Sequence, residues 1–445
     1  MHTSRSRGGG RLLDRIMRRI ARSHLAALAI IPLIFLAMRL PLIPAAWPER
    51  PPMECISPGE SGQFEGCGFI FDEAHYIPAI RRMMLGDLAV NVEHPPLSKM
   101  IIWLGIILLG DNPWGWRTLN VLFSAATILV AGLLAYRLTR SLRVSALAQL
   151  LLLTDVMFFN ISGFAILDPP ALFFMTLTLY LYASGRWLLS SIPLGLALLS
   201  KSSSILVIPA ILGIELAYPV INGGRIGELI ERGRRIVRLI IIPALIIFLV
   251  GLGIYDALSG AFPTPLHHLD FMLRYHSGLA FQDPRPVEMP LSWIIPPITR
   301  PPAAYYVVTV QPPGWHPVAF WGVSSPLWWS IWLLIPLAYI FIRDNRPIPN
   351  PSLEAIFVAW TVITYGSFLL LAYAYHRWVY SFYFLQVSIP MAIALPAMLE
   401  KNGMSLVLKV MLALQILWFI MWFPVKPDWL LDMLLNLGLG EVPWI

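Results

Sequence analysis

Two short polar segments stand between long hydrophobic stretches of this chain. The first contains adjacent carboxylates, Asp72 and Glu73, and the second begins with His94 and ends with Lys99. Ionisable residues so close to apolar stretches are costly near a bilayer, so their default interpretation is a functional site. Carboxylates can accept protons and cations can neutralise an anion. The pattern indicates chemistry on an anionic substrate at a membrane surface.

The composition indicates a membrane protein. Of the 445 residues, 57% are hydrophobic and 13% charged, and the mean hydropathy is positive. Several stretches exceed the ~18 apolar residues needed to cross a bilayer. The net charge of +7 does not indicate a nucleic-acid partner, because the basic residues cluster at the ends of apolar stretches, as in cytoplasmic loops.

The apolar stretches predict an all-α polytopic protein with about eleven transmembrane helices. The basic clusters place the N-terminus in the cytoplasm and the C-terminus outside. The stretch 97–110 is short and suits a re-entrant or interfacial helix, and 187–220 suits two short spans that meet near Lys201. The remaining spans are expected at 24–44, 114–136, 144–162, 170–186, 239–255, 326–342, 354–374, 378–398 and 404–423.

These spans divide the chain into five parts. We expect a basic cytoplasmic N-terminus at 1–23, a transmembrane core at 24–255 that includes a partly helical outer loop at 45–113, a second outer loop at 256–324, a four-helix transmembrane part at 325–423 and an extracytoplasmic tail at 424–445.

The first outer loop contains both cysteines of the chain, Cys55 and Cys67. If the loop is extracytoplasmic, a disulfide between them is chemically allowed. Two free thiols are the alternative, and the sequence leaves both open.

Other charged residues fall in turns that the topology places on the same side as Asp72. A solvated loop face also carries charges, but several of these residues directly abut apolar spans. Carboxylates and cations together suit a lipid phosphate: the cations stabilise the phosphate as a leaving group, while a carboxylate accepts a proton from an attacking hydroxyl. The residues are Asp111, Arg117, Asp168, Lys201, His267, His268, Asp270, Arg274, His276, Arg300, His376 and Arg377.

The motifs in this set carry a resemblance to a known family. An Asp-Glu pair, a His-Pro-Pro-Leu-x-Lys motif and an arginine opening the next span resemble the protein O-mannosyltransferases, which belong to the GT-C glycosyltransferases. Further similar segments are the Leu-Asp turn at Asp168, the region 292–301, the Ser-Pro-x-x-Trp-Trp segment at 325–329 and His376-Arg377.

The resemblance implies an inverting transfer of a sugar, usually mannose, from a polyprenyl or dolichyl phosphate to a serine or threonine of a protein. It implies a GT-C fold in the plasma membrane, with the site on the extracytoplasmic face and with no metal and no cofactor. Asp72 would be the base and Glu73 its partner. The expected substrate-binding residues are His94, Lys99, Arg117, Asp168, Arg300, His376 and Arg377.

Several alternatives accompany this interpretation. The acceptor could be a lipid or glycan, as in the related aminoarabinose transferases. A transporter would also have interrupted segments such as 187–220, but its polar residues would lie at mid-membrane rather than on one face. Asp168 is either a helix cap or a partner of a cation on the outer side. The histidines near 267–276 lack a thiolate or a tight ligand set, so a metal site is not expected there.

Overall fold

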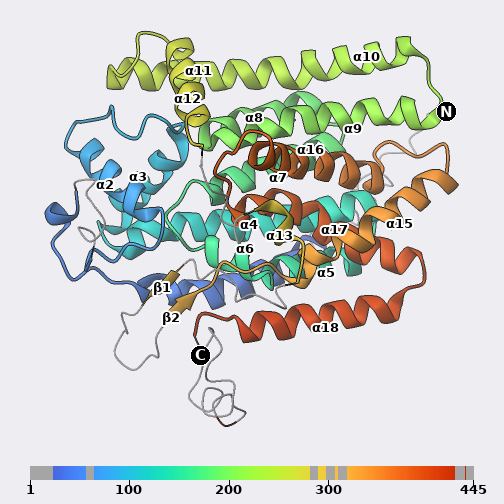
Figure 1. Cartoon of the computed structure of the whole chain (residues 1–445), viewed down its shortest axis with the longest axis horizontal. Helices are drawn as coiled ribbons and strands as arrows, with labels where there is room; N and C mark the ends of the chain where they lie inside the picture. The colour runs from blue at the N-terminus through green and yellow to red at the C-terminus, as the bar shows by residue number, and fades with distance from the viewer. Residues whose placement is uncertain are drawn as a thin grey trace, which may run out of the picture.

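The structure, a computed structural model, describes residues 24–56, 65–280, 289–296, 306–308, 318–425 and 436. Most helices run side by side along the long axis of a bundle, with α10 and α11 along one edge and α18 along the other (Figure 1). The bundle contains the helix His24–Ala45 and α4 (Pro113–Thr139), α5 (Leu142–Leu153), α6 (Val156–Ile161), α7 (Asp168–Ala183), α8 (Trp187–Ser200), α9 (Val207–Asn222), α10 (Ile226–Ile236), α11 (Ile242–Ser259), α14 (Pro326–Trp329), α15 (Ile331–Asp344), α16 (Leu353–Tyr373), α17 (Leu385–Lys401) and α18 (Ser405–Met421).

The apolar composition makes these segments helical, because a helix satisfies its own backbone hydrogen bonds away from water. In the described part of the chain, seven helices are long and apolar enough to cross a membrane, and four more are apolar but shorter. The segment Ser381–Lys401, which contains α17, lies at the centre. Of its most apolar stretch of 18 residues, 89% is buried inside the protein. An almost entirely helical fold is confirmed, whereas the number of eleven spans stays a prediction.

One end of the bundle, at the left in Figure 1, is covered by shorter elements. They are α2 (Glu73–Met84), α3 (Leu97–Leu109), α12 (Pro265–Ser277) and the antiparallel strands β1 (Tyr306–Val308) and β2 (Val318–Phe320), while the short α13 (Pro290–Trp293) appears nearer the middle of the view. The two strands are a small departure from the all-helical prediction. Helix α3 packs closely on α4: a Cβ atom on Gly105 would lie 2.3 Å from the carbonyl oxygen of Gly115. This contact fixes the start of α4 beneath the outer loop.

The sequence-based boundaries are wrong in two places. The expected span 144–162 is two helices, because the carboxylate of Asp155 accepts a hydrogen bond from the Phe158 amide at 2.8 Å and starts α6 anew. The span expected at 239–255 instead begins earlier, as part of one helix that runs from Ile226 to Ser259. At 1.5 Å per residue this helix is about 50 Å long, well beyond the ~30 Å hydrocarbon core of a bilayer.

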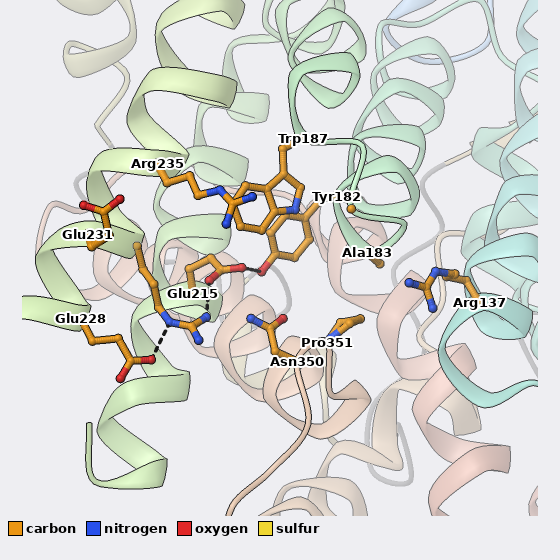
Figure 2. A pocket seen from close by; sticks show the side chains of 12 residues that line it. Arg137, Tyr182, Ala183, Trp187, Glu215, Glu228, Glu231, Arg235, Asn350 and Pro351 are labelled. Carbon is orange, nitrogen blue, oxygen red and sulfur yellow. Dashed lines mark hydrogen bonds and ion pairs between the residues drawn. The ribbon is translucent and has the colours of Figure 1, made fainter. Parts of the chain in front are cut away.

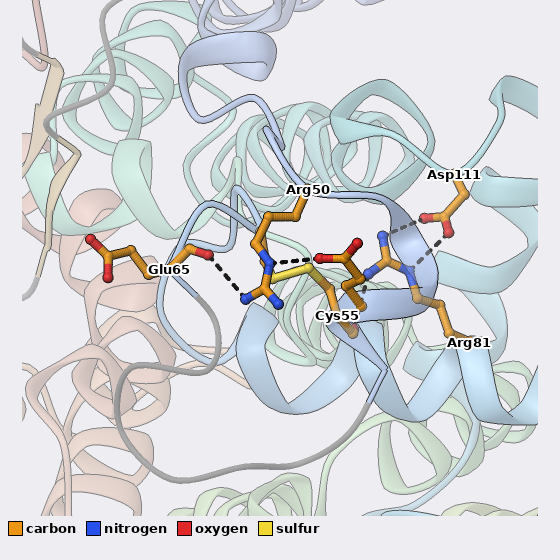
Figure 3. The surroundings of a disulfide bond; sticks show 7 residues. Arg50, Cys55, Glu65, Arg81 and Asp111 are labelled. Carbon is orange, nitrogen blue, oxygen red and sulfur yellow. Dashed lines mark hydrogen bonds and ion pairs between the residues drawn. A yellow bond between two sulfur atoms is a disulfide. The ribbon is translucent and has the colours of Figure 1, made fainter.

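Cys55 and Cys67 form a disulfide, which settles the alternative that the sequence left open. Beside it, the buried Arg81 donates to the Cys55 carbonyl oxygen at 3.0 Å and forms a two-point ion pair with Asp111, with N–O distances of 2.8 and 3.1 Å (Figure 3). The loop is therefore tied through Arg81 to the start of α4.

Removing this disulfide is expected to destabilise the outer loop. The two cysteines are 12 positions apart, and closing a loop of this size stabilises a fold by about 3 kcal/mol in the chain-entropy model. The double variant Cys55→Ser/Cys67→Ser should show a lower Tm in detergent than the parent protein. Reductant should lower the Tm of the parent alone; an equal effect on the double variant would contradict the prediction.

Candidate active site

The two adjacent carboxylates of the first outer loop have opposite environments. Asp72 occupies the N-cap position of α2, but its side chain makes no capping hydrogen bond, and no ion pair to it occurs among the described residues. Glu73 is completely buried. Its Oε1 accepts from the amide of Ala165 at 2.8 Å, and its Oε2 accepts from the amide of Ile70 at 2.8 Å. Glu73 is thus committed to the fold, whereas the carboxylate of Asp72 remains available.

Arg117 completes the environment of Glu73. Its Nε and Nη2 donate to the two carboxylate oxygens at 2.8 and 2.7 Å. Its remaining N–H groups donate to the backbone carbonyls of Ile43 at 2.6 Å, Ala46 at 3.5 Å and Gly68 at 2.8 Å. A guanidinium has five N–H donors, so Arg117 has none left for a ligand. The expectation that Arg117 contacts a phosphate does not fit this arrangement, which gives it a positioning role.

A second ion pair lies nearer to Asp72. The ammonium of Lys201, at the junction of α8 and the following 3-10 turn, donates to Asp168 Oδ1 at 2.6 Å. Both residues are buried, and the ammonium also lies 4.9 Å from the ring centre of Phe382 and 4.7 Å from that of Tyr383. The buried lysine is therefore paired, as the cost of burying a charge requires. Of the two roles that the sequence allowed, Asp168 is the partner of a cation: it is the first residue of α7, and Leu167 occupies the N-cap position.

The electrostatics of this region act on Asp72. Burial raises the pKa of Asp72 from 3.8 to about 7, an effect that the positive charge of Lys201 opposes and the negative charge of Asp168 reinforces. A carboxyl group with a pKa near 7 is a more effective proton acceptor than an ordinary aspartate, because basicity rises with pKa. The site thus combines an available carboxylate with a pKa suited to general-base catalysis.

A histidine pair and an arginine complete the cluster. The rings of His94 and His276 lie 5.3 Å apart, and the ring of Tyr76 meets that of His94 edge-on at 5.9 Å. Burial lowers the pKa of His276 to about 4, with help from Arg377, and burial followed by the charge of Lys99 holds the pKa of His94 well below 6.5. Both imidazoles are therefore neutral at physiological pH.

His94 Nδ1 is buried without a hydrogen-bond partner in the described part of the chain. Arg377 contacts the carbonyl oxygen of His276 through Nη1, and its Nη2 lies 3.3 Å from the Nδ1 of the same residue. These contacts join α12 to the segment that precedes α17. They place a cation and an unpaired imidazole nitrogen in one cluster.

Lys99 supports the loop rather than the cluster. It is completely buried in α3, and its ammonium donates to the carbonyl oxygens of Asn91 and of His94, the latter at 3.2 Å. The neighbouring Ser98 hydroxyl donates to the carbonyl oxygen of Leu167 at 3.1 Å. The motif that ends in Lys99 therefore fixes the position of His94 and of the turn before Asp168.

The structure therefore divides the residues expected from the sequence into two groups. Asp72, Asp168, His94 and Arg377 lie around the cluster, while Glu73, Lys99 and Arg117 make the buried contacts that hold it. His376 is exposed and Arg300 lies outside the described residues. Sequence reasoning noted Lys201 and His276 as charged outer residues but did not assign them to the site. The signal for Lys201 was an ionisable residue inside an apolar stretch.

Comparisons with known proteins show which proteins the chain resembles. Residues 68–252 match the family described as dolichyl-phosphate-mannose-protein mannosyltransferase. The chain is 34% identical over 119 residues to a polyprenol-phosphate-mannose–protein mannosyltransferase of Corynebacterium glutamicum, covering 24% of this chain and 23% of that protein. It is 30% identical over 165 residues to an undecaprenyl phosphate-alpha-4-amino-4-deoxy-L-arabinose arabinosyl transferase of Pseudomonas aeruginosa, covering 33% and 30%.

Among solved structures, the protein O-mannosyltransferase Pmt1-Pmt2 complex of Saccharomyces cerevisiae bound to the sugar donor matches with a TM-score of 0.66 and 11% identity, over 90% of both chains. The chain therefore has the GT-C fold and is an integral membrane protein. Residues 68–252 are thus similar to the dolichyl-phosphate-mannose-protein mannosyltransferases, the family whose motifs the sequence resembles. The matched segments span less than a third of the length of these relatives.

Proposed function

We propose that the protein transfers a sugar, namely mannose, with inversion from a polyprenyl phosphate to serine or threonine hydroxyls of proteins. The observation that carries this proposal is the unengaged carboxylate of Asp72 beside the Lys201–Asp168 pair, within the segment that matches the mannosyltransferase family. The name of the C. glutamicum relative supports the same donor and acceptor classes.

In this reaction the acceptor hydroxyl oxygen attacks the anomeric carbon of the sugar. The bond from that carbon to the phosphate oxygen breaks, and the lipid phosphate leaves with the electron pair. Asp72 takes the proton of the attacking hydroxyl, and its pKa near 7 favours this transfer. Because the displacement occurs in one step, the configuration at the anomeric carbon inverts.

The leaving phosphate needs positive charge more than it needs a proton donor. Lys201 and Arg377 supply charge at the cluster, and His94 offers its unpaired Nδ1 to a phosphate or sugar hydroxyl. We propose that Arg300 and His376, as the sequence predicts, complete the donor site. The reaction then requires neither a metal nor another cofactor.

We also propose that the Asp72 end of the bundle is extracytoplasmic in the plasma membrane and that the N-terminus is cytoplasmic. The opposite end carries basic residues at the end of α4 and the start of α5, and others on α10, which is the distribution expected of a cytoplasmic face; those near α4 and α5 are Arg137, Arg140 and Arg143. A disulfide on the Asp72 side agrees with an oxidising compartment.

An assay with defined substrates tests the proposal. The purified protein is incubated with radiolabelled polyprenyl-phosphate mannose and a peptide rich in serine and threonine, and incorporation into the peptide is measured. We expect transfer that depends on both substrates. The proposal would be contradicted if the protein neither transferred mannose to the peptide nor released free mannose from the polyprenyl-phosphate donor.

The match to the P. aeruginosa arabinosyl transferase supports a second candidate, transfer of an amino sugar from undecaprenyl phosphate to a lipid or glycan acceptor. The same catalytic cluster would serve, because the donor also carries a lipid phosphate. Parallel reactions with a polyprenyl-phosphate aminoarabinose and a glycolipid acceptor distinguish the two. Preferential labelling of the glycolipid would favour the second candidate.

The acid side of the pH–rate profile should report the charge of Asp168. Asp168 raises the pKa of Asp72, so Asp168→Asn should lower that pKa and move the rise in kcat/KM to lower pH, while its amide oxygen still accepts from Lys201. Asp87→Asn serves as the control that should leave the profile unchanged, because Asp87 lies in the outer loop that contains Asp72 but is exposed and paired with Arg82. A movement to higher pH in Asp168→Asn would contradict the assignment.

A further inference from the structure

A second polar site lies at the opposite end of the bundle from Asp72. A pocket of about 460 Å³ is formed between the ends of α4 and α7, the start of α8, the middle of α9, α10 and the segment before α16. Arg137, near the end of α4, lines it. Arg137 is twenty positions beyond Arg117, which at 1.5 Å per residue places the pocket about 30 Å along the helix from the candidate active site. The proposed reaction therefore does not use this pocket.

One wall of the pocket is a satisfied charge network. Glu215 is completely buried and accepts from the Tyr182 hydroxyl at 2.9 Å and from Arg232 Nη1 at 3.0 Å. Arg232 also donates to Glu228 at 3.0 Å. Two carboxylates thus share one guanidinium, and this wall is built into the fold rather than being a loose set of surface charges.

Two other arginines of the pocket have no carboxylate partner among the described residues. Arg235 lies with its guanidinium 4.1 Å from the ring centre of Trp187, an orientation that leaves its N–H edges open. Arg137 faces the pocket from the other side, and the side chain of Asn350 lies between the two (Figure 2). Glu231 is exposed at the rim, with its carboxylate on the side away from Arg137. Of the lining side chains named here without an ion pair among the described residues, Arg235 and Arg137 are therefore cationic, Asn350 is neutral, and Glu231 at the exposed rim is anionic.

The pocket continues onto an apolar outer surface. Directly after Trp187, the side chains of Leu188, Leu189 and Ile192 on α8 are 58%, 49% and 48% exposed. In a helix of a membrane bundle, such side chains face lipid tails. A ligand with a negatively charged head and a hydrocarbon tail would place the head between the arginines and the tail along α8.

We propose that this pocket binds the headgroup of an anionic phospholipid, with its phosphate oxygens accepting hydrogen bonds from Arg235 and Arg137 and with Asn350 contacting the polar part of the head. Arginine suits this role because its fixed fork of donors matches phosphate oxygens. The volume accommodates a whole headgroup rather than a single ion. Bound lipid would connect α4, α8 and α10 at this end of the bundle.

The test measures binding of short-chain phosphatidylglycerol to the full-length protein in a neutral detergent by native mass spectrometry and calorimetry. Arg235→Gln and Arg137→Gln should each weaken binding about tenfold or more, the usual effect of losing a charge-assisted hydrogen bond. Arg234→Gln is the matched control, because Arg234 is an exposed neighbour on α10 that does not line the pocket. Its binding should equal that of the parent protein.

Further measurements keep the outcomes distinct. Inorganic phosphate is titrated in parallel, and tight binding of phosphate with no added affinity for the lipid would overturn the lipid assignment. An equal loss in Arg234→Gln and Arg235→Gln would show general surface attraction and would also overturn it. A Tm increase on adding the lipid, present in the parent and in Arg234→Gln but absent in Arg235→Gln, is expected and separates lost binding from misfolding.

Discussion

Replacing Asp72 with asparagine is expected to abolish sugar transfer while leaving the protein folded and able to bind the donor. The substitution preserves shape but removes the group that accepts the proton of the attacking hydroxyl. General-base catalysis contributes about 10²- to 10⁴-fold to rates, so kcat should fall by at least the lower figure. The measurement is single-turnover transfer from polyprenyl-phosphate mannose to peptide, with donor binding determined separately.

Asp87→Asn is the matched control, because Asp87 lies in the same outer loop as Asp72 and its carboxylate is exposed and bonded to Arg82. It should retain full activity. Full turnover by Asp72→Asn would contradict the assignment of the base, and an equal loss in both variants would point to damage to the loop instead.

The Asp72→Asn substitution should also raise the stability of the folded protein. This effect separates a catalytic role of Asp72 from a structural one. Burial raises the folded-state pKa of Asp72 from 3.8 to about 7, so the folded protein resists ionisation that the unfolded chain permits. The resulting cost to folding is absent below pH 4, grows between pH 4 and 7, and is complete above pH 7. The Tm of Asp72→Asn should therefore exceed that of the parent protein at pH 8 and converge with it at low pH.

Hydropathy predicted much of the bundle because its physical cause is local. Segments such as Pro113–Thr139 and Leu353–Tyr373 are long, apolar and bounded by charged or capping residues, so their helical state follows from the requirement to satisfy backbone groups in lipid. The break at Asp155 was missed because one aspartate in an apolar stretch does not reveal whether its side chain caps a helix or pairs elsewhere. Here it does both, since it also accepts from the Ser325 hydroxyl at 2.6 Å.

The division of labour inside the site could not be read from the sequence. Asp72 and Glu73 are adjacent and chemically alike, and only the fold shows that one is free and the other enclosed. The partner of Glu73 is 44 positions away, and that of Lys201 is 33 positions away in the opposite direction. Such long-range pairs depend on how helices pack, which neither composition nor periodicity specifies. The motif therefore located the site but did not distinguish residues that react from residues that position them.

Glu73→Gln is expected to destabilise the protein severely. The change removes the charge that compensates the completely buried guanidinium of Arg117 and replaces an acceptor of the Ala165 or Ile70 amide with a donor. Breaking a buried ion pair by removing one partner costs about 3–5 kcal/mol. The free energy of unfolding, measured by denaturant titration in detergent or by Tm, should fall accordingly. Activity should fall with it, because Asp72 is held at the start of the same helix.

Arg117→Met and the double variant Glu73→Gln/Arg117→Met complete a thermodynamic cycle. Arg117→Met should also be destabilising, because it leaves Glu73 charged and buried and leaves the carbonyls of Ile43 and Gly68 without donors. The double variant should be less destabilised than the sum of the single variants, since no buried charge is left uncompensated. If Arg117 instead contacted the lipid phosphate, as the sequence suggested, Arg117→Met would weaken donor binding at unchanged Tm and the two stability effects would add. The cycle therefore distinguishes a cation that binds substrate from one that holds the catalytic loop in place.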